Sequence, residues 1–440
     1  MSDPGTGSSS RLRAVSGRAG WGLVDQAFSS LTNFVLGVFV ARSVGIREFG
    51  MFGLAFAAYS VAMGITRAVA GEPFGVRYST CPTHEWRRGA RDSMGAVLVV
   101  GVAVGMICVV AGLFVGGSVR GILLTLGLAM PFLMVQDGWR YIFFASGESK
   151  RAFVNDLVWS LLLIPSFAIV ILSGVESAWS FVVAWAAAAA VAAVVGCWQA
   201  RLVPLPTRIL AWCRGERDLI PGFLGDFAVR NGTQRATVFL VAAIAGLAAT
   251  GALRGADMLL GPVTILFMGV NPIAVPEAAR LIKRRPARLP RAMALLSCVL
   301  SASAVLLGAA LLLLPDQIGR TLLSDTWEPA REVVFWLSLA LAASAANTGA
   351  MIGMRALGDS KRMFRTRLVA APTILVGVVI GASVGGAAGA AIGNAAATSL
   401  TDLVWWRRFR ESFNERAGKP VEEGSKISHR LVADQIANSQ

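Results

Sequence analysis

Charged side chains inside apolar stretches are the residues that could do chemistry in this chain. Even on insertion scales, a charge at the centre of a bilayer costs about 2.5–3.5 kcal/mol, so such groups should face the protein interior or a water-filled cavity. Guanidinium groups in such a place suit a dense anion, and a desolvated carboxylate suits the carriage of a proton. The charged residues in question are Asp25, Arg67, Asp137, Arg140, Asp226, Arg230, Arg235, Arg254 and Asp257.

Some of these charges have a partner close by in sequence. Residues three or four apart lie on one face of a helix, so opposite charges at that spacing can neutralise each other, and a purely structural role for them stays open. Three pairs have this spacing: Asp137–Arg140, Arg254–Asp257 and Asp226–Arg230.

Arg235 and Arg67 have no acidic residue at that spacing within their apolar runs. Arg235 is near the middle of its predicted span, too deep for its guanidinium to reach the membrane surface easily. It is therefore our first choice for a residue that meets an anionic ligand. Arg67 lies nearer the end of its span and could pair with Glu72.

Polar residues also form a stripe on the first predicted helix, which carries Asp25, Ser29, Thr32 and Asn33 at the spacing of one helical face. A second stripe follows 201 residues later: Asp226, Arg230, Thr233 and Gln234. The stripes could line a central cleft or make hydrogen bonds between helices. We predict substrate contacts at Arg235, Arg67, Arg230, Arg140, Arg254, Asn33 and Gln234, and cation coupling at Asp25 and Asp226.

Composition indicates the elements that must position these groups. The 440 residues are 55% hydrophobic with a mean hydropathy of +0.62, which predicts an all-α polytopic membrane protein. Two histidines, and five cysteines without ligand spacing, give no reason to expect a metal, a cofactor or a catalytic triad. About twelve spans are expected, at 21–41, 49–71, 93–116, 121–145, 152–173, 177–200, 220–246, 250–276, 292–315, 332–354, 366–384 and 387–406.

The basic residues predict the orientation of these spans. Of the 41 lysines and arginines, 31 lie in the termini and in the loops on the same side, and five in the loops on the other side. Positive loops stay in the cytoplasm, so both termini are expected there. This distribution accounts for the net charge of +15 without nucleic acid, and it places the basic loops against anionic lipid headgroups.

The chain also repeats itself. Residues 145–153, ASGESKRAF, return as ALGDSKRMF at 356–364, and Gly45 and Gly50 fall on Gly246 and Gly251 at the offset of the polar stripes. Two six-helix lobes of the same orientation are expected, related by an axis along the membrane normal. The predicted parts are an N-terminal segment at 1–20, an N-lobe at 21–200, a linker at 201–220, a C-lobe at 221–406 and a tail at 407–440.

Several motifs resemble those of the multidrug/oligosaccharidyl-lipid/polysaccharide (MOP) exporter superfamily, in particular its polysaccharide-biosynthesis proteins. They are LVDQ at 23–26, ARSVGIREFGMF at 41–52, GEP at 71–73 and the repeated G-x-S-K-R loop. The resemblance covers nearly the whole chain without its tails, and implies a MATE-like fold with alternating access by two rocking lobes. In the flippase branch the cargo is a polyprenyl-pyrophosphate-linked oligosaccharide, coupled to a proton or sodium, and cavity arginines meet the pyrophosphate.

Two other functions compete with a flippase. A MATE-like cation-coupled drug or metabolite antiporter should have acidic and aromatic residues in its cleft, whereas here arginines outnumber aspartates in the spans. A membrane glycosyltransferase, polymerase or ligase should have a large outer loop, whereas the longest one expected here is about 316–331. We therefore expect a transporter and not an enzyme.

Overall fold

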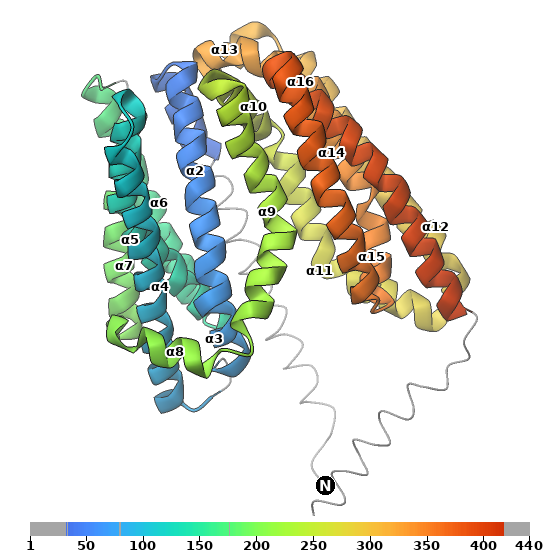
Figure 1. The fold of residues 1–440 in the computed structure, drawn as a ribbon, viewed down its shortest axis with the longest axis horizontal. Coiled ribbons are helices and arrows are strands. Elements are labelled where there is room, and N and C mark those ends of the chain that lie inside the picture. The colour runs from blue at the N-terminus through green and yellow to red at the C-terminus, as the bar shows by residue number, and fades with distance from the viewer. Residues whose placement is uncertain (1–31, 33, 79–80, 176, 418–440) are drawn as a thin grey trace, which may run out of the picture.

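The structure is a computed structural model that describes residues 32, 34–78, 81–175 and 177–417, and within these ranges it is helical without a strand (Figure 1). Residues Phe34–Ser43 end a first helix. The N-terminal half continues with α2 (Ile46–Thr66), a π-helical segment (Arg67–Gly71), α3 (Glu72–Arg77), α4 (Thr83–Leu113), α5 (Gly117–Ala145), α6 (Ser149–Leu172) and α7 (Ala178–Ala200).

The C-terminal half begins with a short linker helix and contains two broken spans. Its helices are α8 (Ile209–Gly215), α9 (Ile220–Ile244), α10 (Gly246–Leu259), α11 (Gly261–Arg284), α12 (Leu289–Leu312), α13 (Asp316–Leu323), α14 (Trp327–Ala346), α15 (Thr348–Ala356) and α16 (Ser360–Ala417). Non-helical angles at Gly385 and Gly386 divide α16 into two arms. Three short 3-10 turns, Pro206–Arg208, Pro286–Arg288 and Ser324–Thr326, complete the list.

The predicted spans agree with these helices. Every span expected between residues 49 and 406 coincides with a helix, an arm of α16 or a broken pair of helices, and the first is described only from residue 32 onward. Eight helical segments of the described chain are long and apolar enough to cross a membrane, and the longest, Lys361–Glu415, holds two of the expected spans. The all-α polytopic membrane fold is therefore confirmed.

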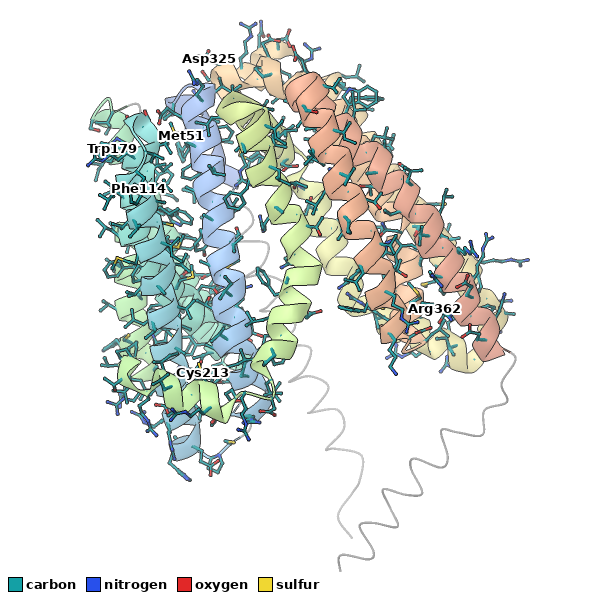
Figure 2. The ribbon with its side chains drawn as sticks, viewed as in Figure 1. Met51, Phe114, Trp179, Cys213, Asp325 and Arg362 are labelled. Carbon is teal, nitrogen blue, oxygen red and sulfur yellow. The ribbon has the colours of Figure 1, made fainter. Side chains whose placement is uncertain are left out.

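The helices form two lobes that lie closer together at one end than at the other (Figure 1). Asp325, beside α13, marks the narrow end, whereas Cys213 in α8 and Arg362 at the base of the C-lobe mark the wide end (Figure 2). We call these the α13 end and the linker end. The first lobe contains α2–α7 and the second contains α9–α16, and α2, α9 and α10 pack against one another between them.

Two glycines at equivalent repeat positions let the lobes approach closely. A Cβ atom on Gly50 of α2 would overlap the carbonyl of Leu247, and one on Gly251 of α10 would overlap the carbonyl of Ile46. Backbones can touch in this way only where no side chain intervenes. The repeat seen in the sequence is therefore also the contact that holds the α13 end together.

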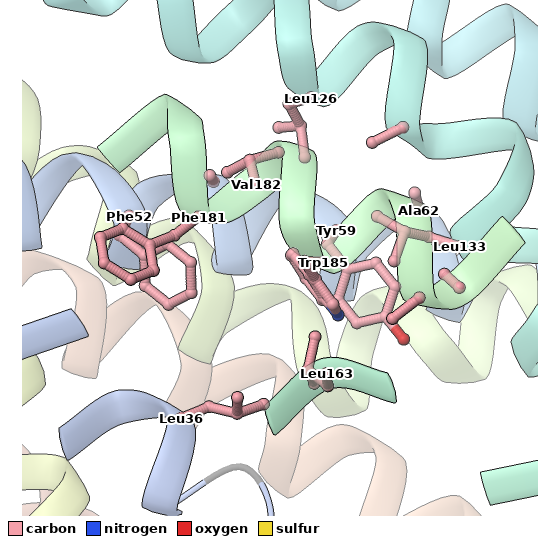
Figure 3. Packing of buried hydrophobic residues seen from close by; sticks show 14 of the residues in the cluster. Leu36, Phe52, Tyr59, Ala62, Leu126, Leu133, Leu163, Phe181, Val182 and Trp185 are labelled. Atoms are coloured by element: carbon pink, nitrogen blue, oxygen red, sulfur yellow. The ribbon is translucent and has the colours of Figure 1, made fainter. Parts of the chain in front are cut away.

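Behind this contact the N-lobe has an aromatic core beneath α2 (Figure 3). The rings of Tyr59 and Trp185 meet edge to face with centroids 4.7 Å apart, and Phe52 packs on the same indole at 6.3 Å. Phe167 and Phe181 make a second edge contact at 5.1 Å. Such pairs add to the burial of apolar area, so α2 is held firmly to the rest of the N-lobe.

The linker helix α8 is bound to the N-lobe. Buried Trp212 donates a hydrogen bond of 2.9 Å from Nε1 to the carbonyl oxygen of Val69, in the π-helical segment. Arg77 forms an ion pair with Asp218 at 2.7 Å. Burial raises the pKa of the Glu216 carboxyl, and Arg77, 3.3 Å away, partly offsets that effect. The linker is therefore attached to the N-lobe by a hydrogen bond and by ion pairs.

We expect Gly50→Ala to move the lobes apart at the α13 end, because the new methyl group overlaps a backbone carbonyl that cannot move aside alone. Overpacking of this kind costs about 1–3 kcal/mol. Spin labels attached at Arg47→Cys in α2 and Arg320→Cys in α13, in a chain without its native cysteines, would report the distance between the two lobes at this end. Gly45→Ala is the matched control, since a Cβ there meets nothing within 4 Å. Unchanged distances in Gly50→Ala would contradict the proposed contact.

Candidate functional site

A cavity of about 160 Å³ lies between the two lobes. The N-lobe contributes Gly53, Phe56 and Ala57 of α2 to its wall. The C-lobe contributes the polar side chains: Gln234, Arg235 and Thr237 from α9, Thr250, Arg254 and Asp257 from α10, and Asn394 from the second arm of α16. The cavity therefore combines an apolar wall from one lobe with two guanidinium groups from the other.

The two arginines of this cavity are not neutralised by an ion pair with any carboxylate of the described residues. The guanidinium carbon of Arg254 lies 4.4 Å from the ring centroid of Phe56, across the lobe boundary. Its Nε is buried and has no hydrogen-bond partner among the described residues. The spacing of Arg254 and Asp257 predicted a local ion pair, which the structure does not form. Asp257 lines the same cavity and is exposed to it.

A second cavity, of about 550 Å³, continues from the first into the C-lobe. The two share Gln234, Thr237, Asp257 and Asn394 as lining residues. Its far wall includes Asn347, Arg355 and Arg367, from the segments around α15 and from α16. A polar path thus runs through the C-lobe from the lobe boundary toward the linker end.

Asp402 lies behind this path. The side-chain amide of Asn347 donates a hydrogen bond of 3.0 Å to Oδ1 of Asp402, and Asn347 itself lines the second cavity. Asp402 was not among the residues predicted from the sequence, although its position in the apolar run 387–406 was a signal that could have identified it. It is a half-buried carboxylate on the C-lobe side of the path.

The N-lobe arginines are in a different situation from those of the C-lobe. Arg67 binds Asp137 with two hydrogen bonds, of 2.9 Å from Nε and 2.6 Å from Nη2. Arg140 forms an ion pair with Asp156 at 2.8 Å. The predictions that Asp137 pairs with Arg140 and that Arg67 pairs with Glu72 are therefore wrong.

The physical reason is tertiary packing. Arg67 opens the π-helical segment, and α2 packs against α5, so its guanidinium reaches Asp137 across the helix boundary. Asp156, near the start of α6, forms the ion pair with Arg140 instead. It also accepts a hydrogen bond of 3.0 Å from the side-chain amide of Gln136. Asp156 lies within the span expected at 152–173, although it was not among the charged residues selected from the sequence. Both guanidinium groups are thus ion-paired with carboxylates of the N-lobe.

The structure places the other predicted residues as follows. Asp25 and Asn33 lie outside the described residues. Arg230 belongs to α9, but its side chain also lies outside the described part. Asp226 is exposed on α9, near the linker end, and Gln234 lines both cavities. Of the seven residues predicted to contact substrate, the structure brings three together: Gln234, Arg235 and Arg254.

The polar stripe of the first helix has one member in the described part. The Thr32 hydroxyl donates a hydrogen bond of 3.3 Å to Ser160 of α6, within the N-lobe. This is the interhelical bonding left open as the alternative to a cleft lining. At the equivalent repeat position Thr233 lines the second cavity. The two stripes therefore have different environments at this level.

Comparisons with known proteins agree with this architecture. No protein-family model matches the sequence, and no curated protein matches it. Among solved structures, the lipid II flippase MurJ in an inward closed conformation aligns with a TM-score of 0.65 at 11% identity, over 89% of this chain and 87% of the other. An inward-facing multidrug resistance MATE family transporter of the MOP superfamily aligns at 0.63 and 15% identity, over 89% and 96%.

This chain has the fold of the MOP-superfamily transporters. An outward-facing MATE family transporter aligns less closely, with a TM-score of 0.53 at 13% identity over 92% of this chain and 96% of the other. The chain thus aligns better with the two inward structures than with this outward-facing one, and its own lobes lie farther apart at the linker end than at the α13 end (Figure 1).

The two groups of arginines should respond differently to mutation. Arg67→Gln leaves the buried Asp137 carboxylate without its partner, so we expect a loss of about 3 kcal/mol in unfolding free energy. Arg254→Gln breaks no ion pair with a described carboxylate, so a loss below about 1 kcal/mol is expected. Thermal unfolding in detergent, followed by tryptophan fluorescence, would measure both. Equal losses would contradict the division into structural and unpaired arginines.

Proposed function

We propose that this protein is a flippase that moves a polyprenyl-pyrophosphate-linked oligosaccharide, or a related polysaccharide precursor, from the inner to the outer leaflet. The observation that carries the proposal is the pair of guanidinium groups of Arg235 and Arg254, which line one cavity between the lobes without an ion pair to a described carboxylate. A pyrophosphate offers several charged acceptor oxygens, and charge-assisted hydrogen bonds from arginine are strong in a cavity away from bulk water.

The buried Nε of Arg254 supports an anionic cargo in particular. A buried donor without an acceptor costs free energy, and a ligand that supplies the acceptor recovers it. In the absence of cargo the guanidinium rests on Phe56 of the other lobe. In our proposal a phosphate oxygen of the cargo accepts a hydrogen bond from Nε of Arg254. This bond weakens the contact between Arg254 and Phe56, so cargo binding changes a contact between the two lobes.

The transport cycle in this proposal is alternating access. In our proposal the protein spans the inner membrane of a bacterium many times, with the linker end, the basic loops and both termini on the cytoplasmic side. The cargo headgroup enters between the lobes at the linker end and meets Arg235, Arg254 and Gln234. The lobes then rock about the start of α9, so the contact between Gly50 and Gly251 opens toward the outer leaflet.

Energy for this cycle comes, in our proposal, from a coupled proton or sodium ion. Asp25 and Asp226 stay the candidates at the equivalent repeat positions, and Asp402 joins them because it is held by Asn347 beside the C-lobe path. A carboxylate in a desolvated place can carry a proton between the two sides. Asp402→Asn would then reduce the dependence of transport on a proton gradient.

Transport should be measured in liposomes with a fluorescent polyprenyl-pyrophosphate oligosaccharide, with and without a proton gradient. We expect Arg235→Gln and Arg254→Gln each to reduce its movement about tenfold or more, because each removes charge-assisted bonds to the pyrophosphate. Lys361→Gln, an exposed charge outside both cavities, is the matched control and should transport normally.

Other outcomes would separate the alternatives. Movement that both arginine variants support at the wild-type rate would keep a flippase and reject this site. No movement of any lipid-linked sugar, together with export of a cationic dye, would reject the flippase in favour of a drug antiporter.

A further inference from the structure

A groove of about 470 Å³ runs along the outer surface of the C-lobe, away from the cavities between the lobes. It lies between α12 and the second arm of α16, and its floor comes from the end of α14. Its lining on α12 consists of small, mostly apolar side chains on successive helical turns: Ala294, Cys298 and Ser301. None of the groups proposed to bind the cargo headgroup contributes to it.

Two arginines stand at one end of this groove. Arg291, in the first turn of α12, and Arg410, near the end of α16, both line it and are both exposed. Neither has an ion pair with a carboxylate of the described chain, whereas Arg407 and Arg408 on the neighbouring turn both pair with Glu411. The two charges at the mouth of the groove are therefore available to a ligand.

The groove is a built feature and not a gap between loose side chains. Trp406 in its wall is fixed by a hydrogen bond of 3.0 Å from Nε1 to the carbonyl oxygen of Ala346. Phe409 is fully buried and packs edge to face on Trp406, with centroids 5.7 Å apart. Behind it Gly349 makes backbone contact with α12 at Met293, so the floor cannot move outward. A rigid wall keeps the groove open.

The distribution of charge along the groove matches a two-part ligand. Cys298 lies seven residues from Arg291, so about 10 Å of apolar channel separates its thiol position from the charged mouth. Neighbouring Leu295 and Val299 on α12 are exposed, as expected for a surface that faces hydrocarbon. The mouth lies at the linker end, where the basic loops gather. An anionic head at the membrane surface and an acyl chain in the membrane would fit these two parts.

We propose that the groove between α12 and α16 binds an anionic glycerophospholipid from the leaflet at the linker end. Arg291 and Arg410 hold its phosphate, and one acyl chain lies along Ala294, Cys298 and Ser301 against Trp406. This site is independent of the proposed flippase function, since it requires only that the protein reside in a membrane. A basic mouth between helices at a membrane surface is a suitable place for a lipid headgroup.

The test is lipid binding by the purified full-length protein, measured by native mass spectrometry during titration with phosphatidylglycerol or phosphatidylcholine. We expect the double variant Arg291→Gln, Arg410→Gln to weaken the first phosphatidylglycerol bound about tenfold or more. Arg288→Gln, an exposed arginine of the same loop outside the groove, is the matched control and should bind as wild type does. Melting temperatures of all variants show whether they are folded.

A second variant tests the apolar part of the site. Cys298→Phe fills the channel while both arginines stay in place, so it should also weaken phosphatidylglycerol. Three results would overturn the proposal: equal binding by the double variant and Arg288→Gln, equal affinity of wild type for phosphatidylcholine, or full binding by Cys298→Phe. Competition by free glycerol phosphate as strong as by the lipid would show a phosphate site without a lipid chain, and would also overturn it.

Discussion

A guanidinium group inside a membrane must find a carboxylate, a ligand or water, because the hydrocarbon offers nothing that stabilises its charge. This constraint divides the buried arginines of the protein. Arg67 and Arg140 find carboxylates within the N-lobe, at Asp137 and Asp156. Arg235 and Arg254 find no such partner among the described residues and face a shared cavity instead. Among the described residues, these N-lobe arginines are thus ion-paired, whereas the two that line the cavity from the C-lobe are not.

The two lobes meet through one contact that is equivalent in both halves of the repeat and one that is not. The halves meet through equivalent glycines, Gly50 and Gly251, whose lack of side chains lets α2 and α10 touch. Close by, Arg254 of the C-lobe lies over Phe56 of the N-lobe, which is an unequal contact. The contact between the glycines joins the lobes through backbone packing, whereas the contact of Arg254 with Phe56 depends on a charged group. The flippase proposed above would use this difference, because cargo that binds Arg254 changes the second contact and leaves the first in place.

The linker adds a mechanical constraint to this arrangement. Trp212 anchors α8 to the carbonyl of Val69, inside the π-helical segment that Arg67 begins. The ion pair of Arg67 with Asp137, the irregular backbone after it and the linker are consequently neighbours in one unit. This unit belongs to the N-lobe, and α9 continues from it along the boundary between the lobes.

The sequence by itself determined the fold class, because apolar runs of membrane length can only be satisfied as helices and because the repeat predicts two similar lobes. It also determined that the charges in those runs matter, and it singled out Arg235, Arg254 and Gln234. Asp25, Asn33 and the Arg230 side chain stay predictions.

Only the tertiary structure decided which of these charges pair. Spacing along one helix predicted Asp137 with Arg140 and Arg254 with Asp257, but side chains choose partners by distance in space. Because α2 packs on α5, Asp137 pairs with Arg67, and because of the position of α6, Arg140 pairs with Asp156. Spacing along a single helix holds no information about a neighbouring helix. The division between structural and ligand-facing arginines was therefore a property of the folded protein.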